Sequence, residues 1–207
     1  MIIWDWNGTL LDDTRVCIDC MNILLTNRNK PLINFEQYRS IFTFPVKEYY
    51  EAAGFDFSKE PFDTPALQFI DLYRRRIQNA GLQTDARYIL EYFRKQGFPQ
   101  AILSAMQHDF LEETIGMHDI QDYFTYIQGI GDHFGNGKAD QASILMQASG
   151  YLPEEVIFIG DTIHDHEVAL ETGCEAILVS NGHQSNERLK QTGRRVIKNL
   201  SELKMIL

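Results

Sequence analysis

The sequence contains few cysteines, no long apolar run and no excess of basic residues. Three Cys occur among 207 residues, and so small and odd a number favours a reducing compartment over a disulfide-built scaffold. No run approaches the roughly 20 apolar residues that span a bilayer, and the N-terminus lacks the basic start of a signal peptide. We therefore expect a cytoplasmic protein that has no membrane partner.

Positive charge is also scarce. Lys and Arg total 19 against 29 Asp and Glu, which gives a formal net charge of -10 at pH 7 and disfavours binding to nucleic acid. An anionic ligand must then be held locally, by a metal ion or by a few placed cations. The rest of the composition, with 44% hydrophobic and 23% charged residues, is typical of a folded globular protein. The length suits one core with a smaller inserted unit.

Short β-type runs alternate with amphipathic helix patterns through most of the second half of the chain. This alternation predicts βαβ units and a Rossmann-like parallel sheet of the α/β class. The helices, chosen by the 3.6-residue period, are expected at 84–96, 108–115, 139–149, 164–172 and 185–191, with a last short helix capped by Ser201. The strands are expected at Ile2–Trp4, Gln100–Leu103, Tyr126–Gln128, Val156–Ile159, Ala176–Val179 and Arg195–Ile197.

Residues 14–81 interrupt this alternation, because they read as helix after helix. The expected helices are 14–28, 34–42, 45–53 and 64–80, separated by prolines and glycines. A helical unit of this size, inserted after the first strand, indicates a lid over a binding site. We therefore expect a core domain of residues 1–13 and 82–207 and a helical cap of residues 14–81.

Polar residues follow three of the expected strands. In an open parallel sheet, ligands bind outside the carboxyl ends of the strands. This rule selects Asp5, Ser104 and Asp161. Asp165 lies one helical turn beyond, and Lys138 begins the helix that precedes the strand before Asp161. The sequence therefore predicts three carboxylates, a hydroxyl and an ammonium around one crevice.

Clustered carboxylates repel one another and raise one another's pKa, so a hard divalent cation is expected among them. Oxygen ligands with room for a substrate fit Mg2+ better than Ca2+, and no Cys or His spacing indicates zinc. With Mg2+ on Asp5 and Asp161, Lys138 and Ser104 can hold a phosphate and Asp5 can act as the nucleophile. The expected reaction is phosphoryl transfer through an aspartyl-phosphate.

Four segments, DWNGTLLDD, AILSAM, GNGKAD and VIFIGDTIHD, resemble in order the four motifs of the haloacid dehalogenase superfamily. The insert is similar to the cap of its phosphoglycolate phosphatase-like and β-phosphoglucomutase-like branch. The resemblance implies a Mg2+-dependent phosphatase that acts on a small phosphorylated metabolite, a phosphoglycolate-like phosphomonoester. It implies catalytic roles for Asp5, Asn7, Ser104 and Lys138, metal binding by Asp5, Asn7 (through its backbone carbonyl), Asp161 and Asp165, and phosphate binding by Gly8, Ser104, Ala105 and Lys138.

The chain departs from the superfamily pattern at one position. Phosphatases and mutases of the superfamily usually carry a second Asp two residues beyond the nucleophile, whereas this sequence has Asn7. An amide cannot carry a proton at neutral pH, and loss of a general acid or base costs about 10²–10⁴ in rate. Three interpretations follow. They are a phosphatase with good leaving groups or a borrowed proton donor, a branch with phosphonate or carbon–halogen hydrolysis, and a weakly active or inactive phospholigand-binding protein.

Other residues near the motifs have ordinary explanations. Asp12 and Asp13 are expected to cap the first helix of the insert. Trp6 sits in the loop after Asp5 and is expected to close over the site as part of the substrate-binding set. Residues 181–183 follow a strand and are assigned to the rim, and the Arg74–Arg76 run to a solvated helix face. The sequence leaves open whether the protein is a monomer or a homodimer.

Overall fold

The computed structural model describes residues 1–131 and 137–207. In this part of the chain a six-stranded sheet has the order β5-β4-β1-β6-β7-β8, and all of its pairs are parallel. The predicted α/β class and parallel sheet are therefore confirmed. The strands are β1 (Ile2–Trp4), β4 (Gln100–Gln107), β5 (Tyr126–Ile130), β6 (Ile157–Gly160), β7 (Glu175–Val179) and β8 (Arg195–Ile197).

Helices cover both faces of the sheet because alternate side chains of each strand point to opposite faces. In β1, Ile2 and Trp4 belong to one buried cluster, whereas Ile3 belongs to another. The first cluster includes residues of α5 (Ala86–Lys95), α6 (His108–Gly116) and the 3-10 helix η4 (Leu200–Met205), and the second includes residues of α7 (Lys138–Ser149) and α8 (Ile163–Glu171). The shorter α9 (Asn186–Lys190), η2 (Gln121–Tyr123) and η3 (Pro153–Glu155) lie in the connections.

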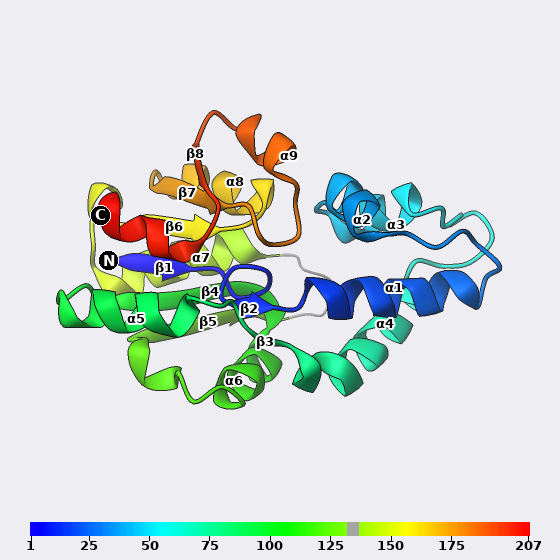
Figure 1. Cartoon of the computed structure of the whole chain (residues 1–207), viewed down its shortest axis with the longest axis horizontal. Coiled ribbons are helices and arrows are strands. Elements are labelled where there is room, and N and C mark those ends of the chain that lie inside the picture. The colour runs from blue at the N-terminus through cyan, green and yellow to red at the C-terminus, as the bar shows by residue number, and fades with distance from the viewer. Residues whose placement is uncertain (132–136) are drawn as a thin grey trace.

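The segment of residues 14–79 contains helices and no strand, as the helical pattern predicts. It lies beyond the carboxyl ends of the strands, at the opposite end of the molecule from both termini (Figure 1). Aromatic rings fill its interior; for example, Tyr49 packs edge-on against both Tyr38 and Tyr50. Its elements are α1 (Thr14–Thr26), α2 (Phe35–Ile41), α3 (Val46–Ala52), α4 (Asp63–Arg76) and the 3-10 helix η1 (Ile77–Asn79).

Two short strands join the chain on either side of this helical segment. β2 (Leu11–Asp12) pairs antiparallel with β3 (Gly81–Leu82), with Asp12 opposite Gly81. Neither strand was predicted, because two residues are too few to show a period. The predicted start of the helical cap at residue 14 falls just after β2, whereas its predicted end at residue 81 falls within β3.

Three details differ from the sequence predictions. The tail forms η4, and Asn199 occupies its N-cap position, where the Asn199 N–H donates to the Glu202 carboxylate. The cap predicted at Ser201 is therefore wrong. Asp13 precedes α1, but its side chain makes no capping hydrogen bond. β4 continues to Gln107, four residues beyond the predicted end.

Among the described residues, no helix combines the length and the hydrophobicity that crossing a membrane requires.

Candidate active site

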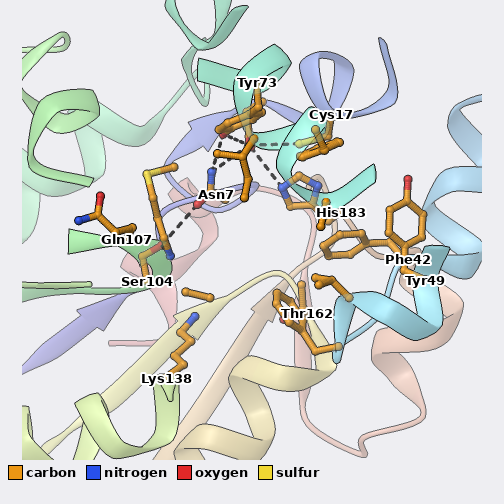
Figure 2. A pocket seen from close by; sticks show the side chains of 18 of the residues that line it. Asn7, Cys17, Phe42, Tyr49, Tyr73, Ser104, Gln107, Lys138, Thr162 and His183 are labelled. Atoms are coloured by element: carbon orange, nitrogen blue, oxygen red, sulfur yellow. Dashed lines mark hydrogen bonds and ion pairs between the residues drawn. The ribbon is translucent and has the colours of Figure 1, made fainter. Parts of the chain in front are cut away.

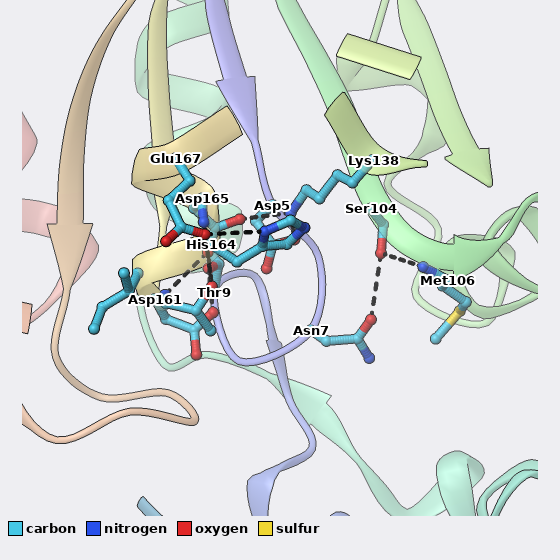
Figure 3. A network of polar contacts seen from close by, with 12 residues as sticks. Asp5, Asn7, Thr9, Ser104, Met106, Lys138, Asp161, His164, Asp165 and Glu167 are labelled. Carbon is cyan, nitrogen blue, oxygen red and sulfur yellow. Dashed lines mark hydrogen bonds and ion pairs between the residues drawn. The ribbon is translucent and has the colours of Figure 1, made fainter. Parts of the chain in front are cut away.

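Three carboxylates and one ammonium meet at the carboxyl ends of β1 and β6. Asp5 follows β1, Asp161 follows β6, and Asp165 lies in the first turn of α8. Lys138, the first residue of α7, places its Nζ 2.5 Å from Asp5 Oδ1 and 2.5 Å from Asp165 Oδ1. Figure 3 shows the lysine reaching from α7 toward both acids. The structure thus brings together, at one buried point, four of the five residues that the sequence predicts around the crevice.

Hydrogen bonds fix the orientation of the two acids from the β6–α8 segment. Asp161 accepts the Thr9 hydroxyl at 3.0 Å through Oδ1 and the His183 backbone N–H at 2.5 Å through Oδ2. Asp165 Oδ2 accepts both the backbone N–H and the hydroxyl of Thr162, which completes a capping box at the start of α8. The local sequence TIHD therefore serves the helix and the site together.

Burial is the largest influence on the charge of these acids. It raises the pKa of Asp5 well above its usual range, against the opposing effect of Lys138, and it raises the pKa of Asp161 to about 6, against the opposing effect of His183. At Asp165 burial acts in the same direction, but the Lys138 ammonium and the hydrogen bonds from Thr162 outweigh it and lower the pKa. The positive charge of Lys138 therefore does not offset the burial of Asp5, and that of His183 does not offset the burial of Asp161.

A divalent cation suits this donor set. Oxygens of Asp5, Asp161 and Asp165 all lie within 4.8 Å of one another and all three residues are buried. When the three carboxylates are ionised, the single ammonium of Lys138 leaves two negative charges in excess. Hard oxygen ligands of this kind are the ones that Mg2+ prefers. The residues present therefore fit the magnesium site that the sequence predicts.

Ser104 reaches the site from a bulge in β4. Leu103 pairs with Gln128 and Gln107 pairs with Ile130, so three residues of β4 oppose the single Gly129 of β5. Such bulges redirect side chains and are common beside active sites. The Ser104 hydroxyl accepts the Met106 N–H at 3.1 Å and lies 3.4 Å from Asn7 Oδ1. Ser104 is thus held within the strand, not after its end as predicted.

The amide nitrogen and the amide oxygen of Asn7 both have hydrogen-bond partners within the protein. Its Nδ2 donates to Asp13 Oδ2 at 2.9 Å and to the Tyr73 hydroxyl at 2.8 Å, while its Oδ1 faces Ser104. The Tyr73 hydroxyl in turn donates to Asp13 Oδ2 at 2.6 Å. Because Tyr73 belongs to α4, this network joins the loop after β1 to the helical segment above it (Figure 2).

Asp13 and His183 form a buried ion pair that was not predicted. His183 Nε2 lies 3.2 Å from Asp13 Oδ1, and Nδ1 lies 2.8 Å from the Tyr38 hydroxyl of α2. Burial lowers the pKa of His183, but the charge and hydrogen bond of Asp13 outweigh it and raise the pKa to about 9. His183 had been assigned to the rim and Asp13 to a helix cap. Both lie at the centre, because the β7–α9 loop folds over the start of α1.

Residues 2–179 match the family described as haloacid dehalogenase-like hydrolase. The chain belongs to this family. It is similar to the phosphoglycolate phosphatase of Pseudomonas putida, with 24% identity over 192 residues that cover 88% of this chain and 70% of that protein. It is also similar to the phosphoglycolate phosphatase of Aquifex aeolicus, with 24% identity over 190 residues that cover 88% of this chain and 85% of that protein.

Solved structures share the fold of this haloacid dehalogenase-like chain. A haloacid dehalogenase-like family hydrolase from Streptococcus pneumoniae superposes with a TM-score of 0.86 at 20% identity, covering 100% of this chain and 97% of the other. A protein described as a predicted phosphoglycolate phosphatase, from Haemophilus somnus, superposes with a TM-score of 0.80 at 17% identity, covering 100% and 96%. These structures confirm the fold, and the family match over residues 2–179 confirms the resemblance inferred from the four motifs.

A cavity opens over the acidic cluster of this family member. Its volume is about 210 Å3, and the helical segment forms much of its wall (Figure 2). The sequence-selected residues that line it are Asp5, Asn7, Ser104, Ala105, Lys138 and Asp165. Asp161 lies beneath them, fully buried.

Trp6 does not reach the cavity, so its expected closure over the site is wrong. The indole is fully buried, and its Nε1 donates to the Thr114 hydroxyl of α6 at 3.0 Å. Because a buried indole N–H needs an acceptor, this partner draws the ring into the core.

Gly8 shapes the loop but directs its N–H inward. The N–H donates to Asp13 Oδ1 at 2.9 Å and to the Leu11 carbonyl at 2.9 Å, not toward the cavity. Gly8 has φ +75, and a Cβ there would lie 2.3 Å from Asp161 Oδ2. Only glycine fits so close to the acid.

Residues 132–136, from the GNGKAD motif and the loop before Lys138, lie outside the described residues.

Proposed function

We propose that this protein is a Mg2+-dependent phosphatase that hydrolyses a small phosphomonoester through an aspartyl-phosphate on Asp5. The observation that carries the proposal is the position of the Asp5 carboxylate, which lies 2.5 Å from the Lys138 ammonium on the wall of the cavity that also contains Ser104. A nucleophilic oxygen, a fixed cation and a hydroxyl around one point are the groups that phosphoryl transfer requires. The phosphoglycolate phosphatases among the relatives support the same reaction class.

In the proposed reaction, one Asp5 oxygen attacks the phosphorus, and the bond from phosphorus to the leaving-group oxygen breaks. The Lys138 ammonium and the Ser104 hydroxyl stabilise the negative charge on the phosphoryl oxygens in the transition state. Water then attacks the phosphorus of the aspartyl-phosphate, which releases inorganic phosphate and restores the Asp5 carboxylate. Bound by Asp5, Asp161, Asp165 and the Asn7 carbonyl, Mg2+ would supply further charge neutralisation at the phosphoryl group.

Asn7 constrains this reaction. Its amide is committed to Asp13, Tyr73 and Ser104 and has no proton to give at neutral pH. His183 has both ring nitrogens directed at protein partners, Asp13 and Tyr38. The leaving group must therefore depart without a proton from residue 7.

Phosphate release by the wild type, Asp5→Asn and Asp122→Asn tests the proposal. Asp122→Asn makes the same chemical change at an exposed position and serves as the matched control. Each protein is assayed on a panel of phosphomonoesters with Mg2+ and with excess chelator. We expect release by the wild type and the control only with Mg2+, and a loss of at least about 10³-fold in Asp5→Asn, because the nucleophile acts as a unit with its neighbours.

Equal rates for the wild type and Asp5→Asn on every ester would contradict the phosphatase proposal. Saturable binding of inorganic phosphate without turnover would instead favour the phospholigand-binding interpretation. The Asn7 amide supports that alternative because both of its N–H groups already donate to protein partners.

A further inference from the structure

The cavity over Asp5 has an aromatic wall. Nine of the described residues that line it are Phe or Tyr. They come from α2, α3 and α4, from the connections between these helices, and from α6 of the core. Figure 2 shows Phe42 and Tyr49 on the opposite side of the pocket from Ser104 and Gln107. Phe69 and Tyr73 stack on each other with ring centroids 5.9 Å apart, which gives a second side of the pocket flat aromatic faces.

Little positive charge in this cavity remains for a substrate. Among the described lining residues the basic side chains are Lys138, His183 and Arg74. Lys138 is paired with two acids and His183 with Asp13. Arg74 is exposed and lies over the Phe110 ring, with its guanidinium carbon 4.2 Å from the ring centroid. Away from the Asp5 end, the wall therefore favours an apolar group over a carboxylate or a sugar.

The size of the cavity limits that group to about one ring. An apolar cavity of about 150 Å3 accommodates benzene, and this cavity measures about 210 Å3, including the space beside Asp5, Ser104 and Lys138. A phosphate beside Asp5 and a single aromatic ring among the phenylalanines would fill it. Ring-to-ring contacts of this kind contribute about 0.5–1.5 kcal/mol each beyond buried area.

The lack of a proton donor at Asn7 limits which aromatic phosphates can react, because it limits the leaving group. A phenol has a pKa near 10, so phenolate leaves without protonation far more readily than the alkoxide of an ordinary alcohol, whose pKa is close to the value of about 16 for water. An enzyme with an amide at residue 7 needs a leaving group of the first kind.

We propose that the substrate is an aryl phosphomonoester, with its ring among the aromatic side chains and its phosphate beside Asp5. This inference rests on the proposed phosphatase function. Asp5 attacks phosphorus, the bond from phosphorus to the phenolic oxygen breaks, and the phenolate takes its proton from water after it leaves. Hydrolysis of the aspartyl-phosphate consumes one water, so the net products are a phenol and inorganic phosphate.

The test compares kcat/KM for three esters that separate the ring from the leaving group. Phenyl phosphate has an aromatic ring and a phenol leaving group, benzyl phosphate has the ring and an alcohol leaving group, and phosphoglycolate has a carboxylate and an alcohol leaving group. We expect phenyl phosphate to exceed benzyl phosphate by about 10²-fold or more, the usual worth of a missing general acid, and benzyl phosphate to exceed phosphoglycolate. Using kcat/KM keeps the comparison on the first chemical step, whatever limits the second.

Variants of α4 test the aromatic wall. Phe69 lines the cavity and is half-buried, whereas Leu67 lies on the same helix and is 53% exposed. We expect Phe69→Ala to lower kcat/KM for phenyl phosphate about tenfold with little change for phosphoglycolate, because the lost contact involves only the ring. Leu67→Ala should leave all three values unchanged.

The outcomes separate this inference from the function beneath it. If no ester gives Asp5-dependent phosphate release, both the phosphatase proposal and the aryl inference are overturned. If release is Asp5-dependent but phosphoglycolate matches or exceeds phenyl phosphate, the phosphatase stands and the aryl inference is overturned. A loss of that phosphoglycolate activity in Arg74→Gln would then identify Arg74 as a carboxylate-binding residue. Equal values for phenyl and benzyl phosphate would also overturn the aryl inference.

Discussion

The amide nitrogen of Asn7 donates a 2.9 Å hydrogen bond to the carboxylate of Asp13. Asp13 also accepts from the Gly8 N–H, the Tyr73 hydroxyl and the His183 ring, so each of these partners is a donor. The charge and hydrogen bonds of these donors outweigh burial and lower the pKa of Asp13. An acid in place of Asn7 would put an acceptor against this carboxylate. The amide that removes a proton carrier from the site therefore also completes a buried network.

Exchanging the two groups tests this pairing. Asn7→Asp should lower the free energy of unfolding by about 1–3 kcal/mol, because two buried acceptors would then face each other. The double variant Asn7→Asp/Asp13→Asn restores a donor and an acceptor. We expect urea unfolding to show it more stable than the sum of the two single variants predicts, by at least about 0.5 kcal/mol. Strict additivity would show that the Asn7–Asp13 contact contributes nothing.

Gly8→Ala should damage the site more than backbone strain alone explains. Gly8 and Gly97 have nearly the same φ, +75 and +77, but an added Cβ at Gly97 meets nothing within 4 Å, whereas at Gly8 it meets Asp161 and His183. Gly97→Ala should cost about 1–2 kcal/mol of stability from the left-handed backbone. Gly8→Ala should add about 1–3 kcal/mol from overpacking and abolish Mg2+-dependent turnover. Equal losses of stability and activity in the two variants would refute the close approach.

Trp6→Phe should affect stability and spare substrate binding. The change removes the N–H that Thr114 accepts in the core, at an expected cost of about 1–3 kcal/mol in urea unfolding. Because the indole lies outside the cavity, KM for a phosphomonoester should stay within about twofold of the wild-type value. A large rise in KM at unchanged stability would return Trp6 to the substrate-binding set.

Magnesium should raise the thermal midpoint of the wild type and leave that of Asp161→Asn unchanged. A ligand that binds only the folded state stabilises it by about 1.4 kcal/mol for each tenfold excess over Kd. Asp122→Asn, which keeps all three clustered acids, should respond like the wild type. An equal shift in Asp161→Asn would place the ion elsewhere.

Most of what the sequence predicted well follows from local patterns. Alternation of short apolar runs with helical periods identifies a parallel sheet, and the sheet fixes where its strands end. Asp5 and Asp161 could be chosen because each directly follows a strand that the pattern reveals. Lys138 could be chosen because it opens the helix before one of them.

What could not be predicted depends on contacts between distant segments. His183 meets Asp13 and Tyr38 across 170 and 145 positions of the chain respectively, and no local period reports such a meeting. For Trp6 the deciding partner is Thr114, which lies 108 positions away. The sequence alone therefore cannot distinguish an aromatic residue that packs in the core from one that lines the site, when both lie beside a nucleophile.

The β2–β3 ladder holds the entrance and the exit of the helical segment side by side, with Asp12 opposite Gly81. Closing a loop costs little extra free energy as the loop lengthens once its ends are already held together. A longer connection between the helices of this segment should therefore cost little folding free energy while the ladder is kept. We therefore expect the ends of this segment to stay fixed on the core when residues between them change, so that cavity-lining side chains of α4 such as Phe69 can be substituted without displacing Asp5 or Asp161.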